Sequence, residues 1–368
     1  MRFPEFSGEW KMCTIGELTT KVGSGVTPRG GEAVYKTEGH PFVRSQNVGL
    51  GNLLLDDIAF IDEETHLRQK STELQFNDVL LNITGASIGR SALVAKQIVG
   101  GNVNQHVCII RTKENLVPSF ICSFLLSNYG QRQIDSFQAG GNRQGLNFEQ
   151  IKSIKITIPS KDEQIKIAKL LRAIDERIAT QNKIIDKLQS LIKGIAQNVA
   201  RNNKPNIRLS ECLECSSSTL QESDVCKNGT YPVYGANGIV GYLDNYNTEK
   251  EAVYIIKDGS GVGTVSYVTG KCSATGTLNT LQAKEGYSLQ YLYYMLKVFN
   301  FEPYKTGMAI PHIYFKDYGK AKIFCPSYTE QLKYARLLSA IDNKLSAEQS
   351  ILTDLSLQKQ YLLRQMFI

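Results

Sequence analysis

A segment of 17 residues occurs twice in this chain. The first copy begins at Pro159 and the second at Pro326, 167 residues later, and 11 of the 17 positions are identical. An ungapped match of this quality indicates an internal duplication. In both copies a Pro-Ser pair is followed by a Glu-Gln pair and then by a long run of regularly spaced apolar residues. The chain is therefore expected to fold as two related halves.

Each copy opens a long amphipathic pattern. Apolar residues recur with a 3.5-residue period over residues 167–199 and again over residues 334–366. A period of 3.5 held over this length is typical of a coiled-coil seam rather than of an ordinary surface helix. Each helix is expected to cover about 36 residues, or roughly 54 Å. Asp162 and Thr329 are the expected N-caps.

Each seam is interrupted by one polar residue, Gln181 in the first and Glu348 in the second, at equivalent positions of the repeat. In an antiparallel pair of helices related by a pseudo-twofold axis, both would lie near the axis. A buried polar residue in a seam fixes the register at some cost in stability. The alternative is that both point into solvent where the seam locally slips. The residues alone leave these two interpretations open.

A globular segment precedes each helix. The expected organisation is a first globular domain at 1–158, a first spacer helix at 159–200, a linker at 201–206, a second globular domain at 207–325 and a second spacer helix at 326–368. Residues 79–89 and 253–263 also align, so the duplication extends into the globules. We predict a mixed α/β (α+β) fold, in which β-rich cores are separated by two long antiparallel coiled-coil helices.

Composition excludes several classes of protein. Hydrophobic residues make up 42% and charged residues 21% of the chain, and no window approaches the ~20 apolar residues of a membrane span. The amino terminus lacks a secretory signal pattern, so we expect a cytoplasmic protein without a membrane partner, with its eight cysteines as free thiols. The net charge of +7 is evenly spread; it is compatible with a polyanionic partner but does not establish one.

No catalytic, metal or cofactor site is expected from the motifs. The glycine-rich segments at 85–89 and 259–263 precede β-rich runs, whereas a phosphate-binding loop opens a helix. We therefore expect strand, turn and strand at both places. The chain has no P-loop, His-Glu-x-x-His or amino-methyltransferase motif, and the Cys212–Cys215 spacing lacks a second pair of zinc ligands. The four isolated histidines are interpreted as packing or hydrogen-bonding residues.

Loops that mix glycine with polar side chains are the best candidates for function. Arginine pairs with guanine and asparagine or glutamine with adenine in the major groove of DNA, while Ser, Thr and Lys reach phosphates. Ordinary surface turns have the same composition, so that alternative stays open. The candidate DNA-binding residues are Ser24, Thr27, Arg29, Arg44, Gln46, Asn47, Thr84, Ser87, Arg90, Asn104, Gln105, His106, Asn142, Arg143 and Gln144 in the first globule and Tyr234, Asn237, Lys257, Ser260, Asn279, Lys305 and Thr306 in the second.

Several of these segments resemble one known family over the whole chain. Ile15-Gly16-Glu17-Leu18, Gly23-Ser24-Gly25-x-Thr27-Pro28, Ile83–Arg90, Asn104-Gln105-His106 and the two Pro-Ser-x-x-Glu-Gln helix openings are similar to the specificity subunit of type I restriction-modification enzymes. The second globule departs from the first, with Asp258–Gly263 in place of Thr84–Gly89.

The resemblance implies a non-catalytic subunit. Its two target-recognition domains would each read one half of a split, asymmetric site in double-stranded DNA. Its paired helices would act as spacer and as the dock for two modification subunits, which bind S-adenosylmethionine and methylate adenine. Restriction subunits would add translocation and cleavage driven by ATP and Mg²⁺. The alternatives are a coiled-coil scaffold and a stand-alone DNA-modifying enzyme.

Overall fold

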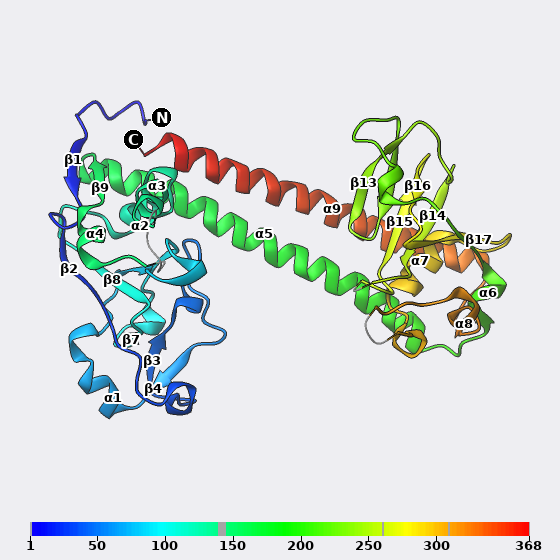
Figure 1. Cartoon of the computed structure of the whole chain (residues 1–368), viewed down its shortest axis with the longest axis horizontal. Helices are drawn as coiled ribbons and strands as arrows, with labels where there is room; N and C mark the ends of the chain where they lie inside the picture. The colour runs from blue at the N-terminus through cyan, green and yellow to red at the C-terminus, as the bar shows by residue number, and fades with distance from the viewer. Residues whose placement is uncertain (1, 139–144, 260, 308–309, 368) are drawn as a thin grey trace. The chain divides into compact units, whose positions relative to one another are not determined.

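The structure is a computed structural model that describes every residue except 1, 139–144, 260, 308–309 and 368. The chain divides into two compact units. Unit 1 contains Met1–Gln181 and Ile351–Ile368, and unit 2 contains Asn182–Ser350. Each unit has a β-rich globular segment and a portion of each of two long helices, α5 (Lys161–Arg201) and α9 (Tyr328–Gln365) (Figure 1).

Unit 1 is built on a four-stranded antiparallel sheet and a smaller three-stranded sheet. The large sheet has the order β2 (Thr19–Ser24), β8 (Val107–Thr112), β5 (Val79–Asn82) and β6 (Ser91–Leu93). The small sheet has the order β4 (Ala59–Ile61), β3 (His40–Val43) and β7 (Asn102–Val103), and β3 is parallel to β7. Strand β1 (Lys11–Thr14) pairs with β9 (Lys155–Ile158). The short helices are α1 (Glu63–Arg68), α2 (Pro118–Leu126), α3 (Asn128–Ser136) and α4 (Phe148–Ser153).

Unit 2 repeats this topology. Its large sheet has the order β11 (Leu213–Ser217), β17 (Leu278–Ala283), β14 (Glu251–Ile256) and β15 (Val265–Thr269). Its small sheet has the order β13 (Gly238–Leu243), β12 (Tyr231–Gly235) and β16 (Ser273–Ala274), and β12 is parallel to β16. Strand β10 (Ile207–Arg208) pairs with β18 (Lys322–Ile323), and the short helices are α6 (Leu209–Cys212), α7 (Leu289–Lys297) and α8 (Phe315–Tyr318). The predicted duplication of the globules is confirmed.

The two central strands of unit 1 are buried on both faces, which explains why they read as continuous apolar runs. Successive side chains of a strand point to opposite faces of the sheet. Val79 and Leu81 of β5 accordingly belong to the core formed with α2 and α5, whereas Leu80 belongs to a second core on the other face. The sheet is thus held between two apolar layers.

The long helices begin at Lys161 and Tyr328, before the predicted N-caps. Ser160 precedes α5, and its hydroxyl accepts a hydrogen bond from the main-chain amide of Glu163 at 3.4 Å. Ser327 precedes α9, and its hydroxyl donates to Glu330 at 2.8 Å. The expected N-caps at Asp162 and Thr329 were therefore wrong by two residues. The repeated Ser-x-x-Glu is the spacing of a capping box, in which Ser rather than Asp or Thr ends the loop.

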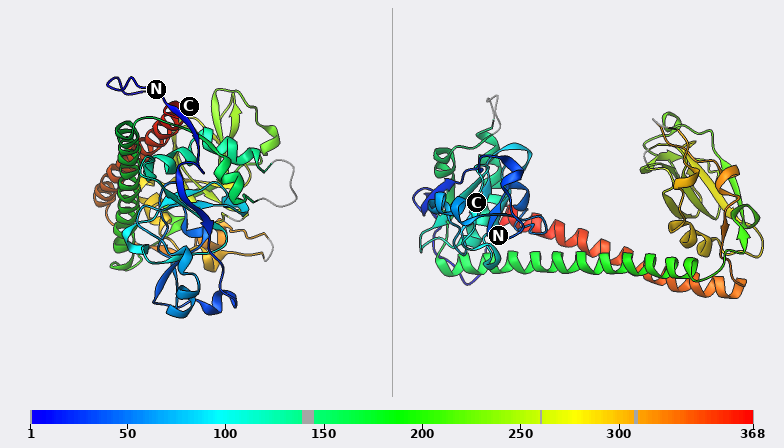
Figure 2. Two further views of the ribbon diagram at one scale, coloured as in Figure 1. Left: turned by 90° about the vertical axis from the view of Figure 1, so that its left-hand side faces the viewer. Right: turned by 90° about the horizontal axis from the view of Figure 1, so that it is seen from below.

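The helix seams are buried within each unit. In unit 1, the start of α5 and the end of α9 lie side by side (Figure 2). Ile167 and Leu171 of α5 share a core with Leu362 and Met366 of α9. In unit 2, residues 192 and 196 of α5 line the same pocket as residue 345 of α9. The two helices are therefore antiparallel in both units. No helix in the described part of the chain is long and apolar enough to cross a membrane.

Gln181 and Glu348 are both buried, with 8% and 6% of their surface exposed. Burial excludes the alternative in which these two side chains point into solvent. Glu348 forms an ion pair with Lys344 one turn earlier on the same helix. The role of both residues in fixing the helix register stays a prediction.

Candidate nucleic-acid interface

Three loops meet at one end of the large sheet of unit 1. The first loop follows β5, the second precedes β8 and the third precedes α4. The main-chain amide of Ile83 donates to the carbonyl of His106 at 3.0 Å, and the amide of Leu146 donates to the carbonyl of Ile83 at 2.8 Å. Main-chain hydrogen bonds therefore join the first loop to the other two.

Unit 2 joins its equivalent loops by the same main-chain bonds. The amide of Lys257 donates to the carbonyl of Thr277 at 3.0 Å, and the amide of Ile313 donates to the carbonyl of Lys257 at 2.9 Å. Strand pairing makes Lys257 the counterpart of Ile83 and Thr277 the counterpart of His106. We call the two sets loop cluster 1 and loop cluster 2; each consists of the loops after β5 or β14, before β8 or β17 and before α4 or α8.

Glycines at equivalent positions shape the first loop of each cluster. Gly85 and Gly89 have φ values of +72° and +85°, and Gly259 and Gly263 have φ values of +99° and +91°. L side chains rarely adopt this conformation. The loops run directly into β6 and β15, so the predicted strand, turn and strand is confirmed at both sites.

The structure gathers five predicted residues around one shallow depression of about 450 Å³ in loop cluster 1. The side chains of Gln46 and Arg90 are exposed at its edge. Arg90 makes no side-chain hydrogen bond or ion pair with any described residue, so its guanidinium is available to a ligand. The predicted residues that line the depression are Gln46, Thr84, Ser87, Arg90 and His106.

A chain of hydrogen bonds orients the polar groups of this depression. The main-chain amide of Thr27 donates to Gln105 Oε1 at 2.9 Å, which places Gln105 Nε2 3.0 Å from His106 Nε2. Since Nε2 of the ring then accepts, His106 carries its proton on Nδ1 and donates it to Thr84 Oγ1, 2.6 Å away. The hydroxyl of Thr84 is left to donate outward, to an acceptor such as a phosphate oxygen or a base edge.

Arg44 and Asn47 support the loop after β3. Arg44 donates to the main-chain carbonyl of Asp57 at 2.9 Å and to its carboxylate at 3.1 Å, and it lies over the ring of Tyr35. Asn47 is buried; its Oδ1 accepts from the amide of Arg44, and its Nδ2 donates to the carbonyl of Leu54. Both side chains thus bind their own loop. Gln46 also donates to the carboxylate of Asp57, at 2.5 Å.

The remaining predicted residues of the first globule lie outside the depression. Asn104 is buried and accepts a hydrogen bond from the amide of His106. Ser24 is half-buried at the end of β2, and Arg29 is exposed further along the same loop. Asn142, Arg143 and Gln144 lie outside the described residues.

Sequence reasoning missed Asn82, a single polar residue in an apolar strand. Its Nδ2 donates to the carbonyl of Ser45 at 2.8 Å and to the hydroxyl of Ser87 at 3.1 Å. Its Oδ1 is buried and has no partner among the described residues. The signal was present, because a buried strand of Val and Leu has no packing reason to end in Asn.

Loop cluster 2 offers different side chains on the same frame. Asp258 stands where loop cluster 1 has Thr84, and Thr277 stands where it has His106. Thr277 forms a hydrogen bond with the hydroxyl of Thr275 at 2.8 Å. Among the predicted residues, Lys257 is half-buried within the cluster, and Ser260 lies outside the described residues.

Four further predicted residues of unit 2 are at or near the surface. Asn237 is exposed at the turn between β12 and β13, and Tyr234 packs against Tyr254 with ring centroids 5.7 Å apart. Lys305 forms an ion pair with Glu302 at 2.6 Å. The amide of the exposed Thr306 donates to the carbonyl of residue 312 at 2.9 Å, in the loop before α8.

Asn279, another predicted residue, is buried inside unit 2. It is buried within β17, where its Oδ1 accepts from the hydroxyl of Ser217 at 2.9 Å and its Nδ2 donates to the hydroxyl of Tyr318. Its amide is therefore bonded within the protein.

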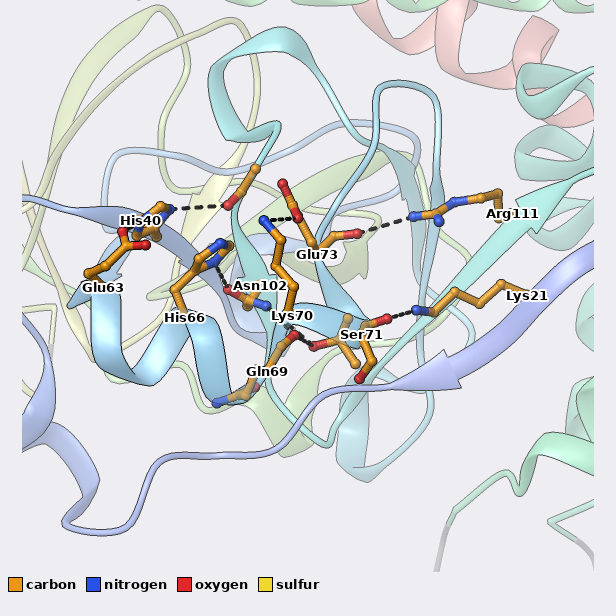
Figure 3. A network of polar contacts seen from close by, with 12 residues as sticks. Lys21, His40, Glu63, His66, Gln69, Lys70, Ser71, Glu73, Asn102 and Arg111 are labelled. Carbon is orange, nitrogen blue, oxygen red and sulfur yellow. Dashed lines mark hydrogen bonds and ion pairs between the residues drawn. The ribbon is translucent and has the colours of Figure 1, made fainter.

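A separate polar network joins α1 and the residues after it to strands β3 and β7 (Figure 3). His66 bonds Asn102 Oδ1 at 2.8 Å, and Asn102 Nδ2 donates to the carbonyl of Gln69 at 2.9 Å. Gln69 Oε1 accepts from the main-chain amide of Val26 at 3.2 Å. The rings of His40 and His66 stack at 3.8 Å. The network fixes the loop that follows β2, in agreement with the prediction that these histidines pack and form hydrogen bonds.

The same network lowers the pKa of the Glu63 carboxyl, because His40 binds the charged form. The described residues contain no group of three or more His, Cys, Asp or Glu side chains that could hold a metal ion. All eight cysteines are free, as predicted.

Two polar loop clusters on one repeated frame define a duplicated recognition protein, and comparison with known proteins supports this class. The chain matches the type I restriction modification DNA specificity domain over residues 7–190 and 205–356. A type I specificity subunit of Mycoplasma genitalium is 25% identical over 320 residues, which cover 79% of this chain and 81% of that protein. The EcoKI specificity subunit of Escherichia coli is 23% identical over 202 residues, which cover 52% of this chain and 41% of that protein.

Solved structures show the same fold. The crystal structure of the type I S subunit from Mycoplasma genitalium has a TM-score of 0.69 at 18% identity and covers 100% of this chain and 99% of that one. A structure from a study of type I complex assembly has a TM-score of 0.57 at 16% identity, covering 98% and 97%. The chain belongs to the type I restriction-modification DNA specificity family.

Proposed function

We propose that this chain reads a bipartite, asymmetric DNA site, one half with loop cluster 1 and the other with loop cluster 2. The observation that supports this most directly is that the same main-chain bonds hold both clusters while the outward side chains differ. A shared frame with different donors and acceptors is suited to two different base sequences. Arg90 and Thr84 of cluster 1 are suited to acceptors on guanine or phosphate, whereas Asp258 of cluster 2 is suited to donors such as the amino group of cytosine.

We infer that the partners are two modification subunits that dock on α5 and α9. The 17-residue repeat supports this, because 11 of its 17 side chains recur at the start of the two helices. The modification subunits would bind S-adenosylmethionine and methylate adenine, and restriction subunits would use ATP and Mg²⁺. On this proposal the chain itself is non-catalytic, and it works in the cytoplasm, where the chromosome is.

The test is to express the full chain with the modification subunit of its own system and to map methylated adenines across the host DNA. We expect pairs of unlike half-sites at one fixed separation. Exchange of residues 207–325 for the same segment of a relative should change one half-site and leave the other. A change in both half-sites would contradict the proposal that each globular domain reads its own half-site.

Two other outcomes would select the alternatives. Methylation or cleavage by the purified chain alone would identify a stand-alone enzyme. A complex that assembles but binds all DNA sequences equally would identify a scaffold.

A further inference from the structure

Unit 1 contains an apolar pocket of about 420 Å³ that lies away from loop cluster 1. It is formed by α2, the first part of α5, the end of α9 and the segments around residues 76 and 93. Leu93, Cys122 and Leu171 form much of its apolar wall, and Phe76 is 53% exposed at its edge. An ion pair between Lys359 and Asp175, with an N–O distance of 2.6 Å, forms part of its polar wall.

The internal repeat identifies the counterparts of the pocket residues in unit 2. Helices α2 and α7 are equivalent, because the glutamine of each repeated motif binds the main-chain amide just before them. Cys122 and Ser123 of α2 therefore correspond to Tyr293 and Tyr294 of α7. Leu93 of β6 corresponds to Tyr267 of β15, since each pairs with the first aligned residue of β5 or β14.

Aromatic rings occupy this region of unit 2. The ring centroids of Tyr293 and Tyr294 are 4.9 Å apart, and those of Tyr293 and Tyr267 are 5.5 Å apart. A pocket of about 420 Å³ remains in unit 2, and Tyr294 is one of its walls. Its α5 residues Ile192 and Ala196 are the repeat counterparts of Lys359 and Leu363, but its α9 wall is shifted to residues 345 and 349. Small side chains thus leave space in unit 1 where unit 2 has rings.

In unit 2, a tyrosine hydroxyl in this region has a hydrogen-bond partner. The hydroxyl of Tyr294 donates to Asp342 Oδ2 at 3.2 Å. Asp342 is the counterpart of Asp175, which lies 167 residues earlier in the repeat and lines the pocket of unit 1. A buried tyrosine needs a hydrogen-bond partner for its hydroxyl. Unit 1 retains the carboxylate without the tyrosine, and there Lys359 is paired with Oδ1 of Asp175.

We propose that the pocket of unit 1 receives a tyrosine side chain from the modification subunit that docks at this end of the helices. Its ring packs against Leu93, Cys122 and Leu171, and its hydroxyl donates to Asp175. The identity of this partner rests on the proposed function. The two docking surfaces of the chain are then unlike, because unit 2 supplies its own tyrosines and unit 1 takes one from its partner.

The test fills the pocket with a side chain of the protein itself. Ser123→Tyr places in unit 1 the residue that unit 2 carries, and Ser136→Tyr on the exposed end of α3 is the matched control outside the pocket. Assembly of the full chain with its modification subunit is followed by sedimentation. We expect Ser123→Tyr to weaken binding of one modification subunit by at least about tenfold, the effect of losing an aromatic anchor. Ser136→Tyr should change it less than about twofold.

A second measurement uses p-cresol, which has the ring and hydroxyl of tyrosine. In NMR titrations, p-cresol should bind the chain alone saturably, with a dissociation constant in the millimolar range. It should also inhibit assembly of the wild-type chain with the modification subunit, but not assembly of Ser123→Tyr. Binding of p-cresol to the wild-type chain tests the proposal even if Ser123→Tyr fails to fold. Normal assembly of Ser123→Tyr, or no saturable binding of p-cresol, would overturn the proposal.

These outcomes are independent of the proposed function. Site-selective adenine methylation by the wild-type complex tests DNA reading, whatever p-cresol does. If the wild-type chain and a modification subunit do not associate at all, the proposed partner is wrong, and the proposed insertion of its tyrosine falls with it.

Discussion

Gln164 Oε1 accepts a hydrogen bond from the main-chain amide of Val117 at 2.9 Å, where helix α2 begins. Its Nε2 donates to the main-chain carbonyls of Asn115 and Pro159, each at 3.1 Å. Gln331 makes the equivalent bond to the amide of Ser288 in unit 2. The glutamine of the repeated motif thus ties each long helix to its own globule through main-chain atoms.

We expect Gln164→Ala to destabilise unit 1. The substitution leaves the amide of Val117 and two carbonyls without their partner, and each buried group left unpaired costs about 1–3 kcal/mol. A loss of about 2–4 kcal/mol in the free energy of unfolding should be seen in urea titrations. Gln358→Ala, at an exposed position of α9, should change stability by less than about 0.5 kcal/mol. Equal stability of the two variants would contradict this role.

Arg90→Ala should weaken DNA binding without affecting the fold. The guanidinium makes no side-chain bond to any described residue, so thermal stability should be unchanged. If Arg90 contacts a base, binding should fall by about 1–3 kcal/mol and selectivity should be lost in one half-site only. If it contacts a phosphate, binding to all DNA sequences should weaken equally. The slope of log binding constant against log salt concentration should then fall by about one counterion.

The control for this measurement is Arg68→Ala. Arg68 is exposed on α1 and forms an ion pair with Glu64 one turn away. It lies outside the depression of loop cluster 1, so its loss should leave half-site selectivity intact. An equal loss of selectivity in both variants would show that Arg90 is not part of the DNA interface.

Asp78→Asn should destabilise unit 1 through a buried charge pair. Arg111 donates to both carboxylate oxygens of Asp78 at 2.7 Å, and the side chain of Asp78 is buried. Hydrogen bonding to Asp78 raises the pKa of the Arg111 guanidinium. An arginine side chain stays protonated even without such a partner, so Arg111 remains charged when Asp78 is replaced by a neutral residue. Because Arg111 is partly exposed, we expect a loss of about 2 kcal/mol, below the range for fully buried pairs. Glu64→Gln, which breaks an exposed pair, should cost less than about 0.5 kcal/mol in the same urea titration.

Cys122 should resist alkylation in the folded chain. Burial raises the pKa of its thiol to about 11, so near pH 8 only about one molecule in a thousand carries the reactive thiolate. Iodoacetamide followed by mass spectrometry should label the exposed Cys226 first. Raising the pH by one unit should increase the thiolate of Cys122 about tenfold. Labelling of Cys122 as fast as Cys226 at pH 8 would show that the pocket wall opens freely.

The helices and the duplication could be predicted from sequence because their signals are local and repeated. A 3.5-residue period requires no knowledge of the rest of the chain, and positions 79–89 and 253–263 align directly. The N-caps were placed two residues late because Asp162 is a good cap by residue type. The repeated Ser-x-x-Glu spacing, which is typical of a capping box, identifies the start of each helix better.

The loops were harder to assign because composition does not say which way a side chain faces. Asn47, Asn104 and Asn279 have the chemistry of base contacts, yet they bond groups of their own unit. Gln46, Thr84 and His106 have the same chemistry and also form hydrogen bonds within unit 1, but they line the depression, whereas the three asparagines are buried. Only the three-dimensional path of the main chain separates these two groups.

The main-chain bonds between Ile83 and His106, and between Lys257 and Thr277, have a consequence for evolution. They involve no side-chain atom, so an outward residue of either loop cluster can be replaced without removing a bond that the fold depends on. Selection can then act on target preference and on folding as nearly separate traits. New preferences can accumulate by single substitutions, each passing through a folded intermediate.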